Sequence, residues 1–183
     1  MTEQFSEKLL TLAKKMRMNT DIRRQIFCIL MSAEDFSDAA EKLVKLGTKN
    51  QTEREVVFVI TDCCMQETKF NPYYGHVAAK LATLDRKYRV AMQFNLWDRV
   101  RQLGDMKKFQ LNNLALLAKF LIIEKAQSLG LLKVIEFAGL IANRIYNDFL
   151  ILTFVIRSRQ GEHEAIENHP GWDTSGIGLR QDF

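Results

Sequence analysis

The chain of 183 residues is 47% hydrophobic and 26% charged, which fits one globular domain with a full-sized core. No apolar run reaches the roughly 18 residues that a membrane span needs, and the N-terminus does not have the pattern of a secretory signal. Three cysteines, two of them adjacent, form no disulfide framework, so a reducing compartment, the cytosol or the nucleus, is expected. The net charge of +4 fits contact with nucleic acid or with an acidic partner and requires neither.

An all-helical chain is predicted, because two prolines and nine glycines, four of them after Gln160, leave the first 159 residues almost free of helix breakers. An N-terminal helix or lead-in is expected within 1–16, and Thr20 is suited to cap the second helix. Ser32 with Asp35 resembles a capping box before the third helix, and Gly47 marks the end of that helix.

The middle of the chain predicts a buried helix followed by one that begins at proline. Asn50 with Glu53 begins the fourth helix, and the run 56–60 is apolar on every side, so this helix is expected at the centre of the core. Asn71 and Pro72 begin the fifth helix, with proline at a position where its missing N–H costs nothing. The expected inner face of the fifth helix consists of Tyr73, Val77, Ala78, Leu81 and Leu84.

Later helices are expected over 86–103, 111–127, 131–137 and 141–156. The segment 138–158 is predicted to be an additional apolar helix, and the polar, glycine-rich 159–183 a flexible tail. Helices of about 12–18 residues joined by short loops predict antiparallel hairpins. We expect these hairpins to stack in a HEAT-like arrangement, with a compact bundle as the alternative.

Cys63, Cys64 and His76 are the residues most suited to bind a metal ion. Adjacent helical residues point about 100° apart, so the two thiols do not chelate one ion as a C-x-x-C pair does, and a fourth zinc ligand is missing. Free cysteine is among the most buried residue types, so packing in the core is the preferred interpretation. No nucleotide-binding, zinc-protease or nucleophile-elbow motif occurs. The sequence therefore predicts no cofactor, no metal and no enzymatic activity.

Basic side chains flank several of the expected loops, and two groups of them are candidates for binding RNA phosphates if they share one surface. These candidates are Arg86, Lys87, Arg89, Lys107 and Lys108. The alternative is a solvated face with acidic neighbours.

The segment LWDRVRQLGDMKK, residues 96–108, places two acids and several bases around one exposed turn and is a candidate partner-binding site. Its candidate residues are Trp97, Asp98, Arg99, Arg101 and Asp105. Trp97 would anchor a partner if its ring were exposed. In the alternative interpretation Trp97 belongs to the core and the charges are solvated.

The segment KVIEF, residues 133–137, matches the loose pattern of peptides that dock on protein phosphatase 1. Docking of that kind requires an extended, accessible strand. The helical spacing instead predicts that Val134 and Phe137 lie in the core, so the phosphatase is a weak candidate partner.

Three segments resemble the MI domain of eukaryotic initiation-type scaffolds: RRQIFCILMSAEDFSDAAEKLVKLG, EREVVFVITDCCMQETKFNPYYGHVAAKL and FNLWDRV. The likeness covers roughly 17–137 and is closest to the nucleolar branch in which an MI domain accompanies a middle domain of initiation factor 4G. That middle domain does not occur in this chain, and after Phe137 the sequence leaves the family pattern. Both features are expected of a fragment, a splice product or a partial gene model.

The resemblance implies a stack of helical hairpins and a non-enzymatic module that binds a DEAD-box RNA helicase of the initiation-factor-4A class. It also implies a place in the nucleolus, in the processing of small-subunit ribosomal RNA, so pre-ribosomal RNA is the expected ligand of the basic groups. In helicase-binding members, a loop after the fifth domain helix carries two aspartates that contact the helicase. Asp105 resembles the first of them, whereas Phe109 and Gln110 stand where the second is expected.

Overall fold

The computed structural model describes residues 7–46 and 52–132, and this part of the chain is entirely helical. The predicted all-α class is therefore confirmed for the described residues. The helices are α1 (Glu7–Lys15), α2 (Asp21–Ser32), α3 (Phe36–Leu46), α4 (Thr52–Gln66), α5 (Pro72–Leu84), α6 (Arg86–Arg101) and α7 (Lys108–Ile123), with 3₁₀ turns η1 (Leu103–Asp105) and η2 (Leu129–Leu132).

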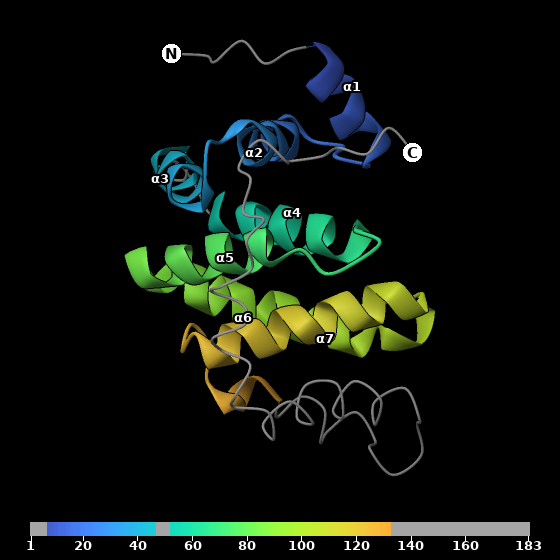
Figure 1. The fold of residues 1–183 in the computed structure, drawn as a ribbon, viewed down its shortest axis with the longest axis vertical. Helices are drawn as coiled ribbons and strands as arrows, with labels where there is room; N and C mark the ends of the chain where they lie inside the picture. The colour runs from blue at the N-terminus through green and yellow to red at the C-terminus, as the bar shows by residue number, and fades with distance from the viewer. Residues whose placement is uncertain (1–6, 47–51, 133–183) are drawn as a thin grey trace, which may run out of the picture.

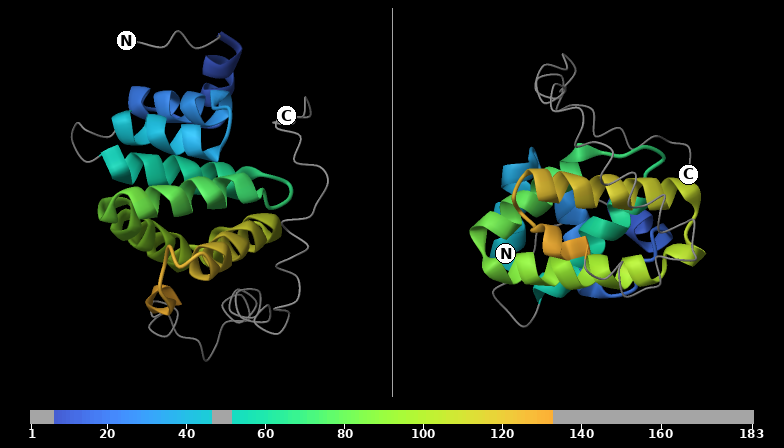
Figure 2. Two further views of the ribbon diagram at one scale, coloured as in Figure 1. Left: turned by 60° about the vertical axis from the view of Figure 1, so that its left-hand side comes forward. Right: turned by 90° about the horizontal axis from the view of Figure 1, so that it is seen from below.

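The helices form antiparallel hairpins that stack along the long axis of the molecule (Figures 1 and 2). In one layer α2 packs on α4 and α4 packs on α6, while in the other α3 packs on α5 and α5 packs on α7. Helix α1 packs on α2 at one end of the stack. This arrangement confirms the predicted HEAT-like stack of hairpins.

Two of the predicted helix starts are confirmed by their capping hydrogen bonds. The Thr20 hydroxyl accepts a hydrogen bond from the Arg23 amide at 3.3 Å, and the Asn71 side chain accepts one from the Tyr73 amide at 3.0 Å. Pro72 is the first residue of α5, as predicted. Both caps are set by residues close in sequence, which is why the sequence alone identifies them.

The predicted capping box at Ser32 is wrong. Ser32 is the last residue of α2, and its hydroxyl donates to the Cys28 carbonyl at 2.7 Å. The cap of α3 is Asp35, whose carboxylate accepts from the Asp38 amide at 2.7 Å. The two other predicted helix boundaries in this region, Gly47 and Asn50, lie outside the described residues.

The centre of the core is α4, as its apolar sequence predicts. Four residues of its apolar run have no exposed surface, namely Val56, Val57, Val59 and Ile60. Cys63 and Cys64 follow them and are also buried, so their predicted packing in the core is confirmed. Burial raises the pKa of the Cys64 thiol to about 12 and that of Cys63 in the same direction, so both thiols are protonated at neutral pH.

The end of α4 is held by a side chain that the sequence does not mark as structural. Asn113 of α7 is buried, and its amide nitrogen donates to the Cys64 carbonyl at 3.2 Å and to the Glu67 carbonyl at 2.7 Å. The last carbonyls of a helix have no partner within the helix. Asn113 therefore satisfies one of them, at Cys64, and through the Glu67 carbonyl ties α7 to the α4–α5 turn.

Other expected boundaries and burials differ from the structure. Leu84 is 48% exposed rather than inward-facing, because it is the last residue of α5 and Asp85 already caps α6. Helix α6 ends at Arg101 instead of continuing to 103. Helix α7 begins at Lys108 rather than 111, because the Gln110 side chain accepts a hydrogen bond from the backbone N–H of residue 107 at 3.1 Å.

Helix α7 also ends earlier than expected, at Ile123 rather than 127. Lys125 has a φ of 56°, a left-handed conformation that does not continue an α-helix. Gln127 beyond it is buried, and its side chain donates to the Arg89 carbonyl at 2.7 Å. Of the helix expected over 131–137, only the first two residues are among the described residues, within η2. The rest of that helix, the expected apolar helix over 138–158 and the expected tail over 159–183 all lie outside the described residues.

Candidate interaction surface

The turn between α6 and α7 presents Asp105 to solvent. Leu103, two residues earlier, has no exposed surface and anchors the turn in the core, and the Asp105 amide donates to the Gln102 carbonyl at 3.1 Å. Within the part of the chain that the structure describes, the Asp105 carboxylate has no ion-pair partner. The turn therefore holds an exposed carboxylate on a short, fixed stretch of backbone.

The neighbouring charges are held by partners inside the chain. Asp98 pairs with Arg101 at 2.8 Å, and both side chains are more than half exposed, so this pair contributes little to stability. Arg99 pairs with Asp62 of α4 at 3.0 Å, and these two side chains are 17% and 16% exposed. Arg99 thus joins α6 to α4, whereas Asp98 and Arg101 lie on the surface beside the turn.

Trp97 is half-buried and serves the fold. Its indole N–H donates to the Leu131 carbonyl at 2.8 Å, which fixes η2 against α6. The exposed aromatic residue of this helix is instead Phe94, which is 54% exposed and meets the Trp97 ring edge-on, with the ring centroids 5.5 Å apart. Sequence reasoning missed Phe94; the signal was its spacing of four residues from Val90 on the outer face of α6.

The candidate RNA-binding cations are all exposed but fall into two separate groups. Arg86, Lys87 and Arg89 lie in the first turn of α6, and Lys107 and Lys108 lie at the start of α7, beyond the other end of α6. Helix α6 has 16 residues, which corresponds to about 24 Å. A nucleic acid that contacts both groups must therefore extend along the whole of α6.

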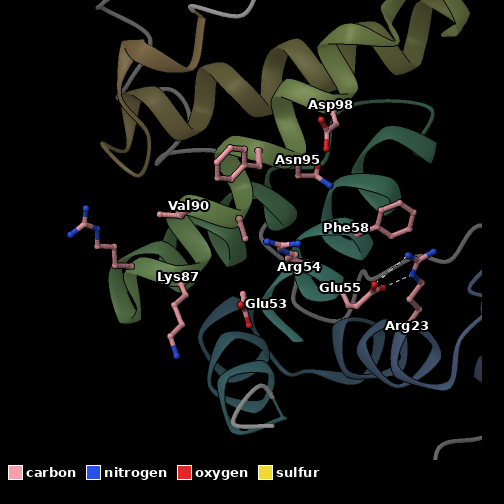
Figure 3. Close-up of a pocket in the computed structure, with 12 residues that line it drawn as sticks. Arg23, Glu53, Arg54, Glu55, Phe58, Lys87, Val90, Asn95 and Asp98 are labelled. Carbon is pink, nitrogen blue, oxygen red and sulfur yellow. Dashed lines mark hydrogen bonds and ion pairs between the residues drawn. The ribbon is translucent and has the colours of Figure 1, made fainter. Parts of the chain in front are cut away.

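A groove on the outer face of α4 and α6 was not predicted. We call it the α4–α6 groove (Figure 3). Its volume is about 700 Å³. The lining includes Glu53, Arg54, Phe58, Lys87, Val90 and Phe94.

Phe58 is in contact with two guanidinium groups at one edge of this groove. The Arg23 guanidinium, from α2, lies 3.9 Å from the centre of the Phe58 ring, and that of Arg99 lies 5.0 Å from it. Arg23 also pairs with Glu55, and Arg99 pairs with Asp62. Together these five residues join three neighbouring helices, α2, α4 and α6.

Neither a metal site nor a membrane-spanning helix occurs among the described residues. Among them no group of three or more His, Cys, Asp or Glu side chains is placed to hold a metal ion. His76 is packed between the rings of Phe36 and Phe120, with centroid distances of 5.1 and 4.8 Å. In the same part of the chain, no helix combines the length and the apolar character that a membrane crossing requires. The segment 133–137, the candidate phosphatase-docking peptide, lies outside the described residues.

Stacked antiparallel hairpins with a charged outer surface define a helical-repeat module, and comparison with known proteins identifies its family. The family model of the MA3 domain, another name for the MI domain, matches residues 22–128, which is more than half of the chain. The chain therefore belongs to the MA3 family, as its resemblance to MI domains predicted.

Relatives from three organisms align with most of this chain. It is 47% identical over 140 residues to Nucleolar MIF4G domain-containing protein 1 of Homo sapiens and 42% identical over 161 residues to that of Mus musculus, covering 76% and 88% of the chain. It is 37% identical over 155 residues to Suppressor of glycerol defect protein 1 of Schizosaccharomyces pombe, covering 80% of the chain. The chain spans only 16%, 19% and 20% of the human, mouse and fission yeast proteins.

Proposed function

We propose that this chain is a non-enzymatic adaptor that binds a DEAD-box RNA helicase of the initiation-factor-4A class through the turn between α6 and α7. The proposed setting is the nucleolus, in the processing of small-subunit ribosomal RNA. Membership of the MA3 family and the nucleolar names of two relatives support this proposal. The observation that carries it is the exposed carboxylate of Asp105 on an anchored turn, which has no ion-pair partner among the described residues.

The proposed contact is an ion pair between Asp105 and an arginine or lysine of the helicase. Since Leu103 already fixes the turn, little conformational entropy is lost when the carboxylate binds. Loss of one partner of a desolvated charge pair costs about 2–5 kcal/mol. Asp98 and Arg101 already pair with each other, so as interface-rim charges they would change the association rate more than the affinity.

Phe109 and Gln110 stand where a second aspartate is expected, so this contact relies on one carboxylate. Gln110 is occupied by the hydrogen bond that starts α7. Phe109 is 37% exposed and offers an apolar contact beside Asp105 instead of a second charge. Arg99 and Trp97 would act indirectly, by holding α6 against α4 and η2.

Titration calorimetry of the full chain against a helicase of this class tests the proposal. We expect Asp105→Ala to weaken binding at least tenfold, or about 1.4 kcal/mol. Asp98→Ala is the matched control, an exposed aspartate with a partner inside the chain, and its effect should be much smaller. If Asp105→Ala binds as tightly as the wild type, the proposed site is wrong.

Direct binding of pre-ribosomal RNA is a second candidate function, favoured by the exposure of the five candidate cations. Its affinity should fall linearly with the logarithm of salt concentration, with a slope set by the number of phosphates neutralised. Replacing Lys87 and replacing Lys108 by alanine should each reduce that slope by about 0.7 for single-stranded RNA. A slope that neither substitution changes would place RNA binding elsewhere.

A further inference from the structure

We propose that the α4–α6 groove docks an acidic amphipathic helix of a second partner protein. This site is separate from the Asp105 turn and takes a ligand of opposite charge. It would allow one chain to join two proteins.

The floor of the groove has exposed apolar side chains. Val90 and Phe94 are 41% and 54% exposed and lie one helical turn apart on α6. The half-buried ring of Phe58 lines the same groove from α4. An apolar strip with polar walls is typical of grooves that receive the apolar face of an amphipathic helix.

The walls of the groove are already fixed. Phe58 contacts the guanidinium groups of Arg23 and Arg99, and both of these arginines have acidic partners on α4. Because these contacts join α2, α4 and α6, the groove keeps its shape without a ligand. A preformed site loses less conformational entropy on binding than one that must be ordered.

The charges left over in the lining favour an acidic ligand. Arg23 pairs with Glu55, and Asp98 pairs with the neighbouring Arg101, so these lining charges are internally neutralised. Three cations of the lining, Arg54, Arg86 and Lys87, have no ion-pair partner among the described residues. Only one carboxylate of the lining, Glu53, is in the same situation among these residues. The charges available to a ligand are therefore mainly positive.

The position of these cations is unfavourable for the protein itself. Arg86 and Lys87 are the first two residues of α6, where a cation is repelled by the helix dipole. Asp85, the N-cap residue, places one carboxylate at this helix end and accepts a hydrogen bond from the Lys87 amide at 2.8 Å. Two cations thus share this one carboxylate, and carboxylates of a ligand would stabilise them further. Figure 3 shows Lys87 and Glu53 at one end of the groove and Asp98 at the other.

The dimensions fit a short helix. Lys87 and Asp98, both in the lining, are eleven residues apart on α6, which corresponds to about 17 Å or about 12 residues of a bound helix. The expected ligand carries acidic residues at the end beside Lys87 and apolar residues along the face that contacts Val90 and Phe94. A nucleic acid fits less well, because the middle of the groove offers the apolar side chains of Val90 and Phe94 and no continuous row of cations for its phosphates.

A phage-displayed library of random peptides of about 16 residues, selected against the full chain, supplies the probe. We expect enriched peptides to combine acidic residues with apolar residues at helical spacing. Phe94→Ala and Lys87→Glu should each weaken the binding of such a peptide at least tenfold, measured by fluorescence anisotropy. Replacing the glutamates of the peptide by lysines should restore its binding to Lys87→Glu.

Matched controls separate this site from the rest of the surface. Ile123→Ala removes an apolar side chain that is 44% exposed on α7, and Lys69→Glu reverses an exposed cation between α4 and α5. Both variants should bind the peptide as the wild type does, and circular dichroism should show all variants folded. Asp105→Ala should also leave peptide binding unchanged, so failure of the helicase proposal and failure of this one are distinguishable.

Several outcomes would overturn the proposal. Selection that enriches no peptide, or only basic peptides, would do so. So would enriched peptides whose affinity neither Phe94→Ala nor Lys87→Glu changes. Binding of a single-stranded oligouridine that requires Arg54 and Lys87, without enrichment of acidic peptides, would show that the groove binds nucleic acid instead.

Discussion

Asn113→Ala should destabilise the fold although it removes only a small polar side chain from α7. The Asn113 amide nitrogen donates to the carbonyls of Cys64 and Glu67, at 3.2 and 2.7 Å, and both carbonyls lose this donor in the variant. A buried group left without its hydrogen bond costs about 1–3 kcal/mol, so the loss is about 2–4 kcal/mol when the partial exposure of the Glu67 carbonyl is considered.

Two smaller effects oppose this loss. The Asn113 side-chain oxygen is buried without a hydrogen-bond partner, so its removal relieves a cost of about 1 kcal/mol. Alanine is also the better helix former, by about 0.5 kcal/mol. The net decrease in the free energy of unfolding is therefore about 1.5 kcal/mol, or about 5 °C in Tm for a domain of this size.

Thermal and urea unfolding of three variants would test this reasoning. Asn112→Ala is the matched control, because Asn112 is half-exposed on the same helix; it should leave stability unchanged or raise it by about 0.5 kcal/mol. Asn113→Asp keeps the volume but places oxygen atoms against both carbonyls, so at neutral pH it should destabilise at least as much as alanine. Equal stabilities for Asn113→Ala and Asn112→Ala, or a tolerated aspartate, would refute the role assigned to the amide.

Two further predictions concern α5 and its contact with α7. Gly75→Ala would place Cβ 2.7 Å from Cδ1 of Phe120, so we expect the free energy of unfolding to fall by about 1–3 kcal/mol despite the gain in helix propensity. The control is Gly104→Ala, whose Cβ meets no atom within 4 Å and which should leave stability nearly unchanged. Urea unfolding measures both. Burial lowers the pKa of His76 below its ordinary 6.5, an effect that Glu124 opposes, so the unfolded chain binds more protons and stability falls as the pH decreases through 6.5 towards the lower folded-state pKa. When the pH is lowered from about 7.5 to about 5.5, the urea midpoint should fall less for His76→Phe than for the wild type. Equal decreases would show that His76 is not the source of this pH dependence.

Features set by nearby residues were predictable from the sequence. Thr20 and the Asn71–Pro72 pair each determine a helix start through contacts within a few residues, and the apolar run of α4 fixes its burial whatever surrounds it. The error at Ser32 has a local cause as well. Two residues suited to cap a helix stood three positions apart, and Asp35, immediately before α3, made the capping bond.

Features that depend on distant residues were not predictable from spacing. Arg23 meets Glu55 32 residues away, Arg99 meets Asp62 37 residues away, and Asn113 reaches Cys64 49 residues away. The turn that carries Asp105 likewise has some features set by nearby residues and others set by distant ones. Its exposure followed from the local pattern, but whether a neighbouring charge was available or already paired depended on contacts that only the fold determines.

Helix α6 connects the two proposed binding sites. Two of the three groove cations that have no ion-pair partner among the described residues, Arg86 and Lys87, lie in the first turn of α6, and the Asp105 turn lies just beyond its last residue. Between them, Arg99 joins α6 to α4 and Trp97 joins it to η2, so the helix has little freedom to tilt or rotate. The cationic end of the groove at Lys87 and the Asp105 turn would thus be held at opposite ends of α6, about 24 Å apart, in a fixed orientation. The defining property of such an adaptor is therefore the distance between its two sites, which depends on the internal contacts of Arg99 and Trp97 even though neither residue need touch a partner.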